Sequence, residues 1–254
     1  MAHTPRLIAT VVAGLVGLAG PAPEARAASL SVNPTQIRLS PRTPSSLLTI
    51  TNEGASAIRV QITVHAWAQR LGGEMDLKPT TDVVFFPSLL TLEPGQKRTI
   101  RIGTTAKFAA TEQSYRIFIE ELPSPNVGGT ETSAVRMYTR LGIPIFLEPP
   151  VAKAQPGLAK VALEAGTLSF QLANTGTTHF VPDSVVVKGF GARGEAAFDR
   201  KLTGWYVLAG SARQFTVAFD SPECSRLRSL VIEARVGDAV MKEQIDTPRG
   251  TCRP

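Results

Sequence analysis

The residue types that carry out chemistry are few in this chain and widely separated. Its histidines are His3, His65 and His179, and none lies near another histidine or a cysteine in the sequence. No GxSxG, HExxH, P-loop or dinucleotide-binding glycine motif is present. Without a nucleophile and a base at a recognisable spacing, we expect no enzyme activity, no metal site and no cofactor.

The two cysteines, Cys224 and Cys252, are 28 residues apart near the end of the sequence. Neither belongs to a CxxC pair, which argues against a zinc site. In an oxidising compartment two thiols in one small domain tend to bridge. We therefore predict a disulfide between Cys224 and Cys252.

Residues 1–27 have the pattern of a cleavable signal peptide. Arg6 precedes an apolar run over residues 7–20, and Ala25-Arg26-Ala27 fits a small-x-small cleavage site. The alternative is an uncleaved membrane anchor, but the apolar run is short for a span. We expect a secreted protein.

The charge of the chain is mildly basic and spread out. The sequence has 27 Lys and Arg and 21 Asp and Glu. Removing the leader, with Arg6, Arg26 and Glu24, leaves 25 basic and 20 acidic residues and a net charge of +5. No Lys/Arg block or interleaving of basic and aromatic residues indicates a nucleic-acid partner.

Apolar and polar residues alternate along most of the chain. Ile58, Val60, Ile62 and Val64 alternate with polar residues, and the segment 135–146 has the same period of two. Turn signals such as Asn52-Glu53-Gly54 and Pro94-Gly95 separate these segments. This pattern is typical of half-buried strands and predicts an all-β fold of immunoglobulin-like sandwiches.

A weak internal repeat predicts two similar domains. LLTITNEGASAIRVQITV (47–64) resembles LSFQLANTGTTHFVPDSVVV (168–187), and Pro149-Pro150 lies between the two halves. A period of about 120 residues suits a whole sandwich domain. We expect a signal peptide over 1–27, a first domain over 28–149 and a second over 150–254.

Five segments together resemble the PapD-like periplasmic chaperones that assemble fimbriae, and the resemblance covers the mature chain. The forms SYRIFIEELP and RLGIPIF look most like the archaic, Csu-type branch. The matching segments are VNPTQIRLS (32–40), EPGQKRTIRIGT (93–104), SYRIFIEELP (114–123), VRMYTRLGIPIFLEP (135–149) and GWYVLAGSARQF (204–215).

The resemblance implies two immunoglobulin-like sandwiches arranged as an L in the periplasm. The partners would be pilus subunits, which borrow a strand from the chaperone, and an outer-membrane usher that receives them; no small-molecule substrate is implied. The lent strand would be Val135–Phe146, with the row Val135, Met137, Thr139 and Leu141 entering the subunit. The long polar loop 123–133 before it suggests a partner-facing segment, although an ordinary surface loop is the alternative.

The family also anchors the carboxylate at the end of the subunit with basic residues. Pro144 and Gln36 stand where the P-pilus type has its two cations, so the anchor must differ here. Arg116 is the first candidate, because a cation within an apolar strand needs a partner. Arg213, Lys201 and Arg140 are further candidates, each also readable as a solvated strand residue. Arg101 and Glu121 match the interdomain ion pair of the family.

Two other function classes remain open at this stage. A secreted adhesin or ligand-binding sandwich would need an exposed aromatic platform, for which Trp67 and Trp205 are the main residues available. An enzyme would need a constellation assembled from distant strands. Co-expression with an unstable pilin separates these classes, since only a chaperone should rescue it.

Overall fold

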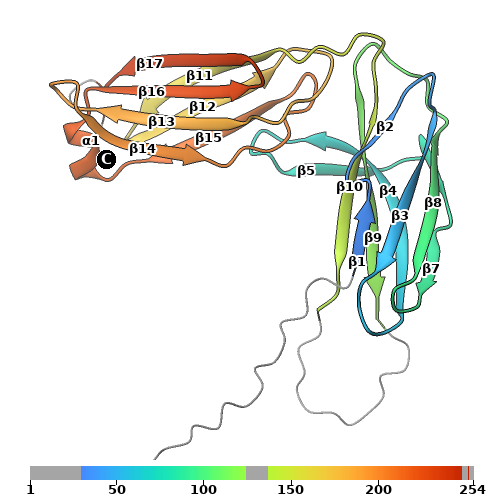
Figure 1. Cartoon of the computed structure of the whole chain (residues 1–254). Coiled ribbons are helices and arrows are strands. Elements are labelled where there is room, and N and C mark those ends of the chain that lie inside the picture. The colour runs from blue at the N-terminus through green and yellow to red at the C-terminus, as the bar shows by residue number, and fades with distance from the viewer. Residues whose placement is uncertain (1–29, 124–136, 248–250, 252–254) are drawn as a thin grey trace, which may run out of the picture.

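The computed structural model describes residues 30–123, 137–247 and 251, and these fold into two β-sandwiches set across one another like the arms of an L (Figure 1). The prediction of an all-β, two-sandwich fold is confirmed. The predicted signal peptide, Val135, Cys252 and nearly all of the loop 123–133 lie outside the described residues. Within the described part, no helix is long and apolar enough to cross a membrane.

The first sandwich pairs a four-stranded sheet with a six-stranded one. In the first sheet the order is β1 (Leu30–Asn33), β3 (Ser45–Asn52), β8 (Lys97–Thr104) and β6 (Val83–Phe86). In the second it is β2 (Ile37–Leu39), β10 (Arg140–Leu147), β9 (Gln113–Leu122), β4 (Ile58–Gln69) and β5 (Met75–Pro79), with β7 (Leu89–Leu92) also pairing with β4.

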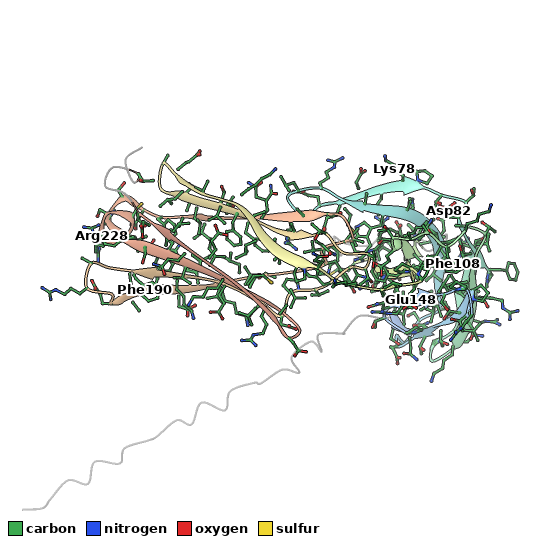
Figure 2. The ribbon with its side chains drawn as sticks, turned by 90° about the horizontal axis from the view of Figure 1, so that it is seen from above. Lys78, Asp82, Phe108, Glu148, Phe190 and Arg228 are labelled. Carbon is green, nitrogen blue, oxygen red and sulfur yellow. The ribbon has the colours of Figure 1, made fainter. Side chains whose placement is uncertain are left out.

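The second sandwich has a three-stranded and a four-stranded sheet. The strand order is β11 (Pro156–Glu164), β12 (Thr167–Asn174) and β15 (Ala212–Ala218) in one sheet, and β14 (Ala196–Leu202), β13 (Ser184–Phe190), β16 (Ser229–Val236) and β17 (Ala239–Asp246) in the other. A short helix, α1 (Ser221–Arg226), joins β15 to β16. Seen from above, Phe190 and Arg228 mark the end of this sandwich far from Glu148 (Figure 2).

Each sandwich has its own hydrophobic core, built by the alternation seen in the sequence. Along β9, Tyr115, Ile117 and Ile119 point into the first core, while Arg116 and Phe118 take the opposite face. The second core gathers residues from Leu168 to Ala234. The connection between the sandwiches runs from the end of β10 to the start of β11 and contains Pro149 and Pro150.

The repeated Asn-x-Gly segments do the same structural work in both domains. The side-chain amides of Asn52 and Asn174 are buried, and each donates to the carbonyl of the residue four positions later. Each side-chain oxygen accepts from the glycine two positions later, Gly54 or Gly176. A buried amide with these bonds fixes the turn between two strands in each sandwich.

The β4–β5 hairpin of the first sandwich reaches the edge of the second (Figure 1). The Leu71 carbonyl at its tip accepts a hydrogen bond of 2.7 Å from the backbone N–H of Gln214 in β15. A Cβ on the neighbouring Gly73 would lie 3.0 Å from the Arg213 side chain, and Gly73 has φ of +94°. Glycine at this position therefore allows both the turn and the close contact between domains.

The predicted disulfide stays a prediction, because Cys252 lies outside the described residues. Its proposed partner Cys224 is buried in the second core. The Thr251 carbonyl accepts from the Gly166 N–H at 3.0 Å, and a Cβ on Gly166 would lie 3.9 Å from the sulfur of Cys224. The residue before Cys252 is thus held close to Cys224, which supports the pairing.

Candidate functional site

Strand β10 has an unpaired edge along its first half. On one side it pairs with β9 over its whole length, from Arg140 opposite Glu120 to Leu147 opposite Gln113. On the other side it pairs with β2 only from Ile145 to Leu147, in parallel. Backbone groups of residues 140–144 on that side face no strand of the described chain, so this edge offers donors and acceptors to an added strand.

The strand is shorter than the sequence predicts, because it begins at Arg140 rather than Val135. Thr139 still bonds to β9, since its carbonyl accepts from the Glu121 N–H at 2.9 Å and its own N–H donates to the Glu121 carboxylate at 3.3 Å. Met137 is 86% exposed, and Leu141 is partly buried against the first core. On the same face of the strand, the side chains of Ile143 and Ile145 are buried in the core of the first sandwich. Exposure therefore falls steadily along one row of apolar side chains.

Arg116 lies on the opposite face of the same sheet and is 6% exposed. Its Nη1 donates to the Gly142 carbonyl of β10 at 3.0 Å. The guanidinium is held between two rings, with Cζ 4.3 Å from the centre of the Trp67 ring and 4.7 Å from that of Trp205. No described carboxylate pairs with it, and burial lowers the pKa of Arg116 by removing water from the charged group.

Glycine at position 142 makes this arrangement possible. A Cβ there would lie 2.9 Å from the Phe118 ring and 3.4 Å from Arg116 Nη1. A larger residue would therefore crowd the Phe118 ring and the guanidinium that bonds to β10. The segment RLGIPIF thus combines an edge strand with the space for a buried cation.

The other predicted cations are placed differently. Arg140 is exposed on β10, pairs with Glu120 at 3.4 Å and covers the Phe118 ring at 4.2 Å. Arg213 packs against the hairpin glycine Gly73, and its buried Nη1 has no hydrogen-bond partner among the described residues. Lys201 is exposed on β14, in the other sheet of the second sandwich, and forms no ion pair with a described residue. The structure brings Arg140, but not Lys201, next to the strand that carries Arg116.

The predicted Arg101–Glu121 pair is not found among the described residues. Arg101 is on the outer face of β8 in the four-stranded sheet, whereas Glu121 is on β9 in the six-stranded sheet, where its carboxylate faces the Thr139 N–H at 3.3 Å. Because the two residues sit on different sheets of one sandwich, they cannot bridge the two domains. The prediction of that pair is corrected accordingly.

A buried polar contact between Glu112 and His179 also crosses the interface, and the sequence analysis missed it. The side chain of Glu112 has 0% exposure, and its Oε1 lies 2.7 Å from His179 Nδ1. The same carboxylate accepts from Thr178 Oγ1 at 2.7 Å and from the His179 N–H at 3.1 Å. The sequence feature that could have singled out Glu112 is its position as a lone acidic residue directly before an apolar strand.

An aromatic cluster completes the contact between the sandwiches. The His179 ring stacks on Phe146, with ring centres 3.8 Å apart. Trp67, Phe146 and Leu208 form a small core of their own, bordered by Trp205 and Tyr206. Gln69 links the two domains, since its Nε2 donates to the Tyr206 carbonyl at 2.6 Å. The position of Arg116 between two rings therefore depends on both domains.

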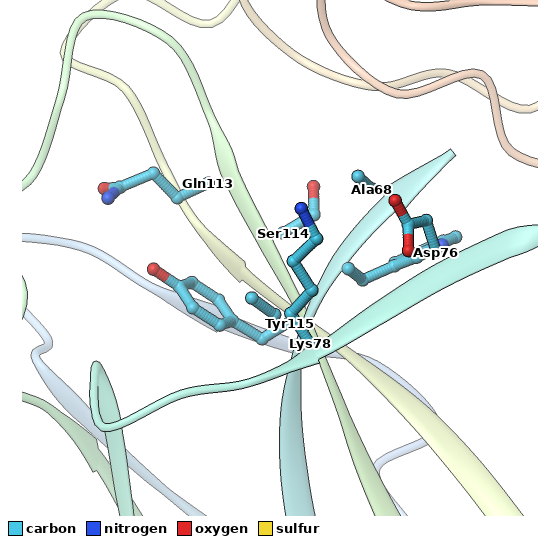
Figure 3. Close-up of a pocket in the computed structure, with 8 residues that line it drawn as sticks. Ala68, Asp76, Lys78, Gln113, Ser114 and Tyr115 are labelled. Carbon is cyan, nitrogen blue, oxygen red and sulfur yellow. The ribbon is translucent and has the colours of Figure 1, made fainter. Parts of the chain in front are cut away.

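A small pocket of about 160 Å³ opens beside this cluster, where β4, β5 and the start of β9 meet (Figure 3). Figure 3 shows the Lys78 amine directed into it, near Ser114, with Asp76 on one side and Gln113 on the other. Trp67 also borders the pocket. Arg116 and His65 are not among the residues that line the pocket, so it is separate from the buried guanidinium.

Comparisons with known proteins agree with this geometry. Residues 29–153 match the family model described as pili and flagellar-assembly chaperone, PapD N-terminal domain. Comparison with curated proteins by sequence gives no match. The first sandwich therefore belongs to the PapD-like family of pilus-assembly chaperones, which are not enzymes.

Solved structures show the same two-domain fold at low sequence identity. A chaperone–tip adhesion subunit complex, CsuC–CsuE, from archaic Csu pili of Acinetobacter baumannii matches with a TM-score of 0.59 and 18% identity, over 86% of this chain and 98% of that one. The Salmonella enterica SafA pilin–SafB chaperone complex matches with a TM-score of 0.59 and 15% identity, over 87% and 98%. The E. coli chaperone DraB gives 0.54 and 16%, over 86% and 98%.

We predict that Glu112→Ala loosens the contact between the domains. Three donors on Thr178 and His179 would lose their acceptor in a buried place, which costs about 2–4 kcal/mol. Urea unfolding should show the loss, and small-angle X-ray scattering should show a broader range of interdomain angles. Glu120→Ala, at an exposed acid on the strand that follows Glu112, serves as the control. An unchanged scattering profile in Glu112→Ala would contradict a fixing role.

Proposed function

We propose that this protein is a periplasmic chaperone that holds pilus subunits by lending them a β-strand and hands them to an outer-membrane usher. The observation that carries the proposal is the open edge of β10 over residues 140–144, together with the exposed side chain of Met137 just before the strand. Membership of the PapD-like family supports it. An added strand would gain backbone hydrogen bonds along this edge and side-chain contacts with alternate residues.

The proposed lent strand comprises Val135, Met137, Thr139 and Leu141, continued by the core residues Ile143 and Ile145. A strand that is buried at one end and open at the other can pair with a subunit without leaving its own sheet. The buried half keeps the strand in place, while each apolar side chain of the free half gains about 1.5–3 kcal/mol when a subunit groove covers it. Affinity would therefore come from the row rather than from any one contact.

Arg116 is proposed to bind the terminal carboxylate of the subunit, with Arg140 as the alternative. A buried guanidinium without a carboxylate partner, bonded to β10 through Gly142, supports Arg116. Arg140 already pairs with Glu120, and Arg213 and Lys201 are on the second domain. The missing cations at Pro144 and Gln36 and the similarity to a chaperone of archaic Csu pili support placing the protein in the archaic branch.

An adhesin or ligand-binding module fits the structure less well. Such a module needs an exposed aromatic platform. Here Trp67 is buried, and Trp205 packs against Trp67 and Arg116 between the domains. The two tryptophans are used to join the sandwiches.

The lent strand is tested by Met137→Asp compared with Ile145→Asp. Met137 is exposed, so its replacement should change the free energy of unfolding by no more than about 0.5 kcal/mol while capture of a co-expressed pilin is lost. Ile145 is fully buried, so aspartate there should unfold the first domain. Thermal melts and co-purification measure the two effects. A stable Met137→Asp protein that still captures pilins would exclude this row as the lent strand.

The anchor is tested by Arg116→Glu and Arg116→Gln, with Arg140→Glu as the matched control on the neighbouring strand. Removing one partner of a desolvated ion pair costs about 2–5 kcal/mol, so pilin affinity should fall at least about thirtyfold for both Arg116 variants. Circular dichroism checks that they remain folded. If Arg140→Glu alone abolishes capture, the anchor is Arg140.

The leader and the disulfide are proposed together, because both follow from export. The mature chain would begin at Ala28, and Cys224 would pair with Cys252 across a loop of 28 residues, contributing about 3 kcal/mol. Intact mass of periplasmic protein, with and without a thiol-alkylating reagent, measures both features. A mass that retains residues 1–27, or one that gains two alkyl groups without reduction, would refute the respective proposal.

A further inference from the structure

Met137 is the most exposed of the methionines that the structure describes. It is 86% exposed, whereas Met75 in β5 is 38% exposed and Met241 in β17 is partly buried against the second core. The remaining methionine of the sequence, Met1, belongs to the predicted leader. Because an oxidant must reach the sulfur atom, the thioether of Met137 is the one that is oxidised first.

Met137 is also the one side chain of the proposed lent row that mild oxidants attack. The row consists of Val135, Met137, Thr139 and Leu141. Aliphatic carbons and a hydroxyl are inert to dilute peroxide, whereas a thioether takes up one oxygen atom and becomes a polar, chiral sulfoxide. An oxidisable group therefore occupies a position where the proposed function needs an apolar side chain.

Hydrogen peroxide is an oxidant of the class that this reaction requires. A lone pair of the Met137 sulfur attacks one peroxide oxygen, so that an S–O bond forms while the O–O bond breaks. The proton of the transferred oxygen moves to the second oxygen, which leaves as water. Sulfur loses two electrons and the peroxide gains them. A methionine sulfoxide reductase reverses the change by supplying two electrons and two protons, which regenerates the thioether and releases water.

The sulfoxide has different consequences in the free and the bound protein. In the free chain Met137 faces water, so the added S–O dipole stays hydrated and the fold is unaffected. In a complex formed through the proposed row, the same dipole would be enclosed in an apolar groove without a hydrogen-bond donor. An unpaired buried polar group of this kind lowers affinity about tenfold to a hundredfold.

We propose that Met137 is a reversible oxidation site that switches off capture by empty chaperone molecules. The inference rests on the proposed function, because it takes the Met137 side chain to enter the subunit groove. A molecule that already holds a subunit would have this sulfur covered, so oxidation acts on the free molecules alone. Reduction returns those molecules to use without refolding or new synthesis.

The site is tested by treating the mature chain with dilute hydrogen peroxide, stopping the reaction with catalase and mapping peptide masses. We expect Met137 to gain an oxygen atom about tenfold faster than Met241, with Met75 between them. Thermal melts should not change. Capture of a denatured pilin diluted into the oxidised chaperone should fall about tenfold to a hundredfold. The two reductases that act on the two sulfoxide epimers should together restore capture.

Variants assign the effect to one sulfur atom. Met137→Leu has an apolar side chain without sulfur at this position, so whatever capture it shows should be the same before and after peroxide. Met75→Leu is the matched control, and its capture should stay as sensitive to peroxide as that of the unaltered chain. Met137→Gln places a polar group of similar length in the row and should reduce capture without any oxidant. In a chaperone–pilin complex formed before peroxide is added, Met137 should be protected.

Three results would overturn the inference. These are oxidation of Met137 no faster than that of Met241, normal capture by the Met137 sulfoxide form, or an equal loss of capture on peroxide treatment in Met137→Leu. The outcomes are distinguishable from failure of the proposed function, which Met137→Asp measures. Loss of capture in Met137→Asp with normal capture by the sulfoxide form would keep the lent strand and reject the switch. Normal capture by Met137→Asp would exclude the lent row and the switch with it.

Discussion

The docking of the two sandwiches depends on the buried carboxylate of Glu112. Its oxygens accept from the Thr178 hydroxyl and from both the backbone and the ring of His179, so one acid on the first domain orders a turn of the second. The His179 ring in turn stacks on Phe146 near the end of β10. The carboxylate is out of water and fully satisfied, which makes its bonds directional and costly to break.

This contact fixes one end of β10 and leaves the other free. From Phe146 backwards, the strand passes from the interdomain cluster through the core residues Ile145 and Ile143 to the exposed Met137. The two faces of the same segment have different uses. One face carries the apolar row, and the other holds Gly142 against the guanidinium of Arg116. Strand and cation are therefore in fixed register, so a partner chain that pairs with the edge would meet the charge at a set distance along it.

The sequence was informative wherever a local pattern determines the structure. Alternation over 58–64 and 115–119 predicted half-buried strands because side chains of a strand alternate between faces. The same alternation singled out Arg116, since a cation among Tyr115, Ile117 and Phe118 must lie on a sheet face with few routes to water. The paired Asn52 and Asn174 turns also followed from sequence, because an Asn-x-Gly turn is local.

Contacts between domains were beyond this kind of reasoning. Glu112 and His179 are 67 residues apart, and no periodicity relates a residue before a strand to one in a distant turn. Arg101 and Glu121 matched the interdomain pair of the family by resemblance, but both lie on the first sandwich, on different sheets of it. Arg116 contacts Trp67 and Trp205, which come from different domains, so this contact depends on how the sandwiches dock.

The β4–β5 hairpin has a further effect on such a molecule. A protein that displays one unpaired strand edge is at risk of polymerising through a second, and the bond from Gln214 to Leu71 occupies β15 with the molecule's own backbone. Folding the hairpin onto β15 thus removes one site at which copies of the chain would join into fibres, while β10 stays free.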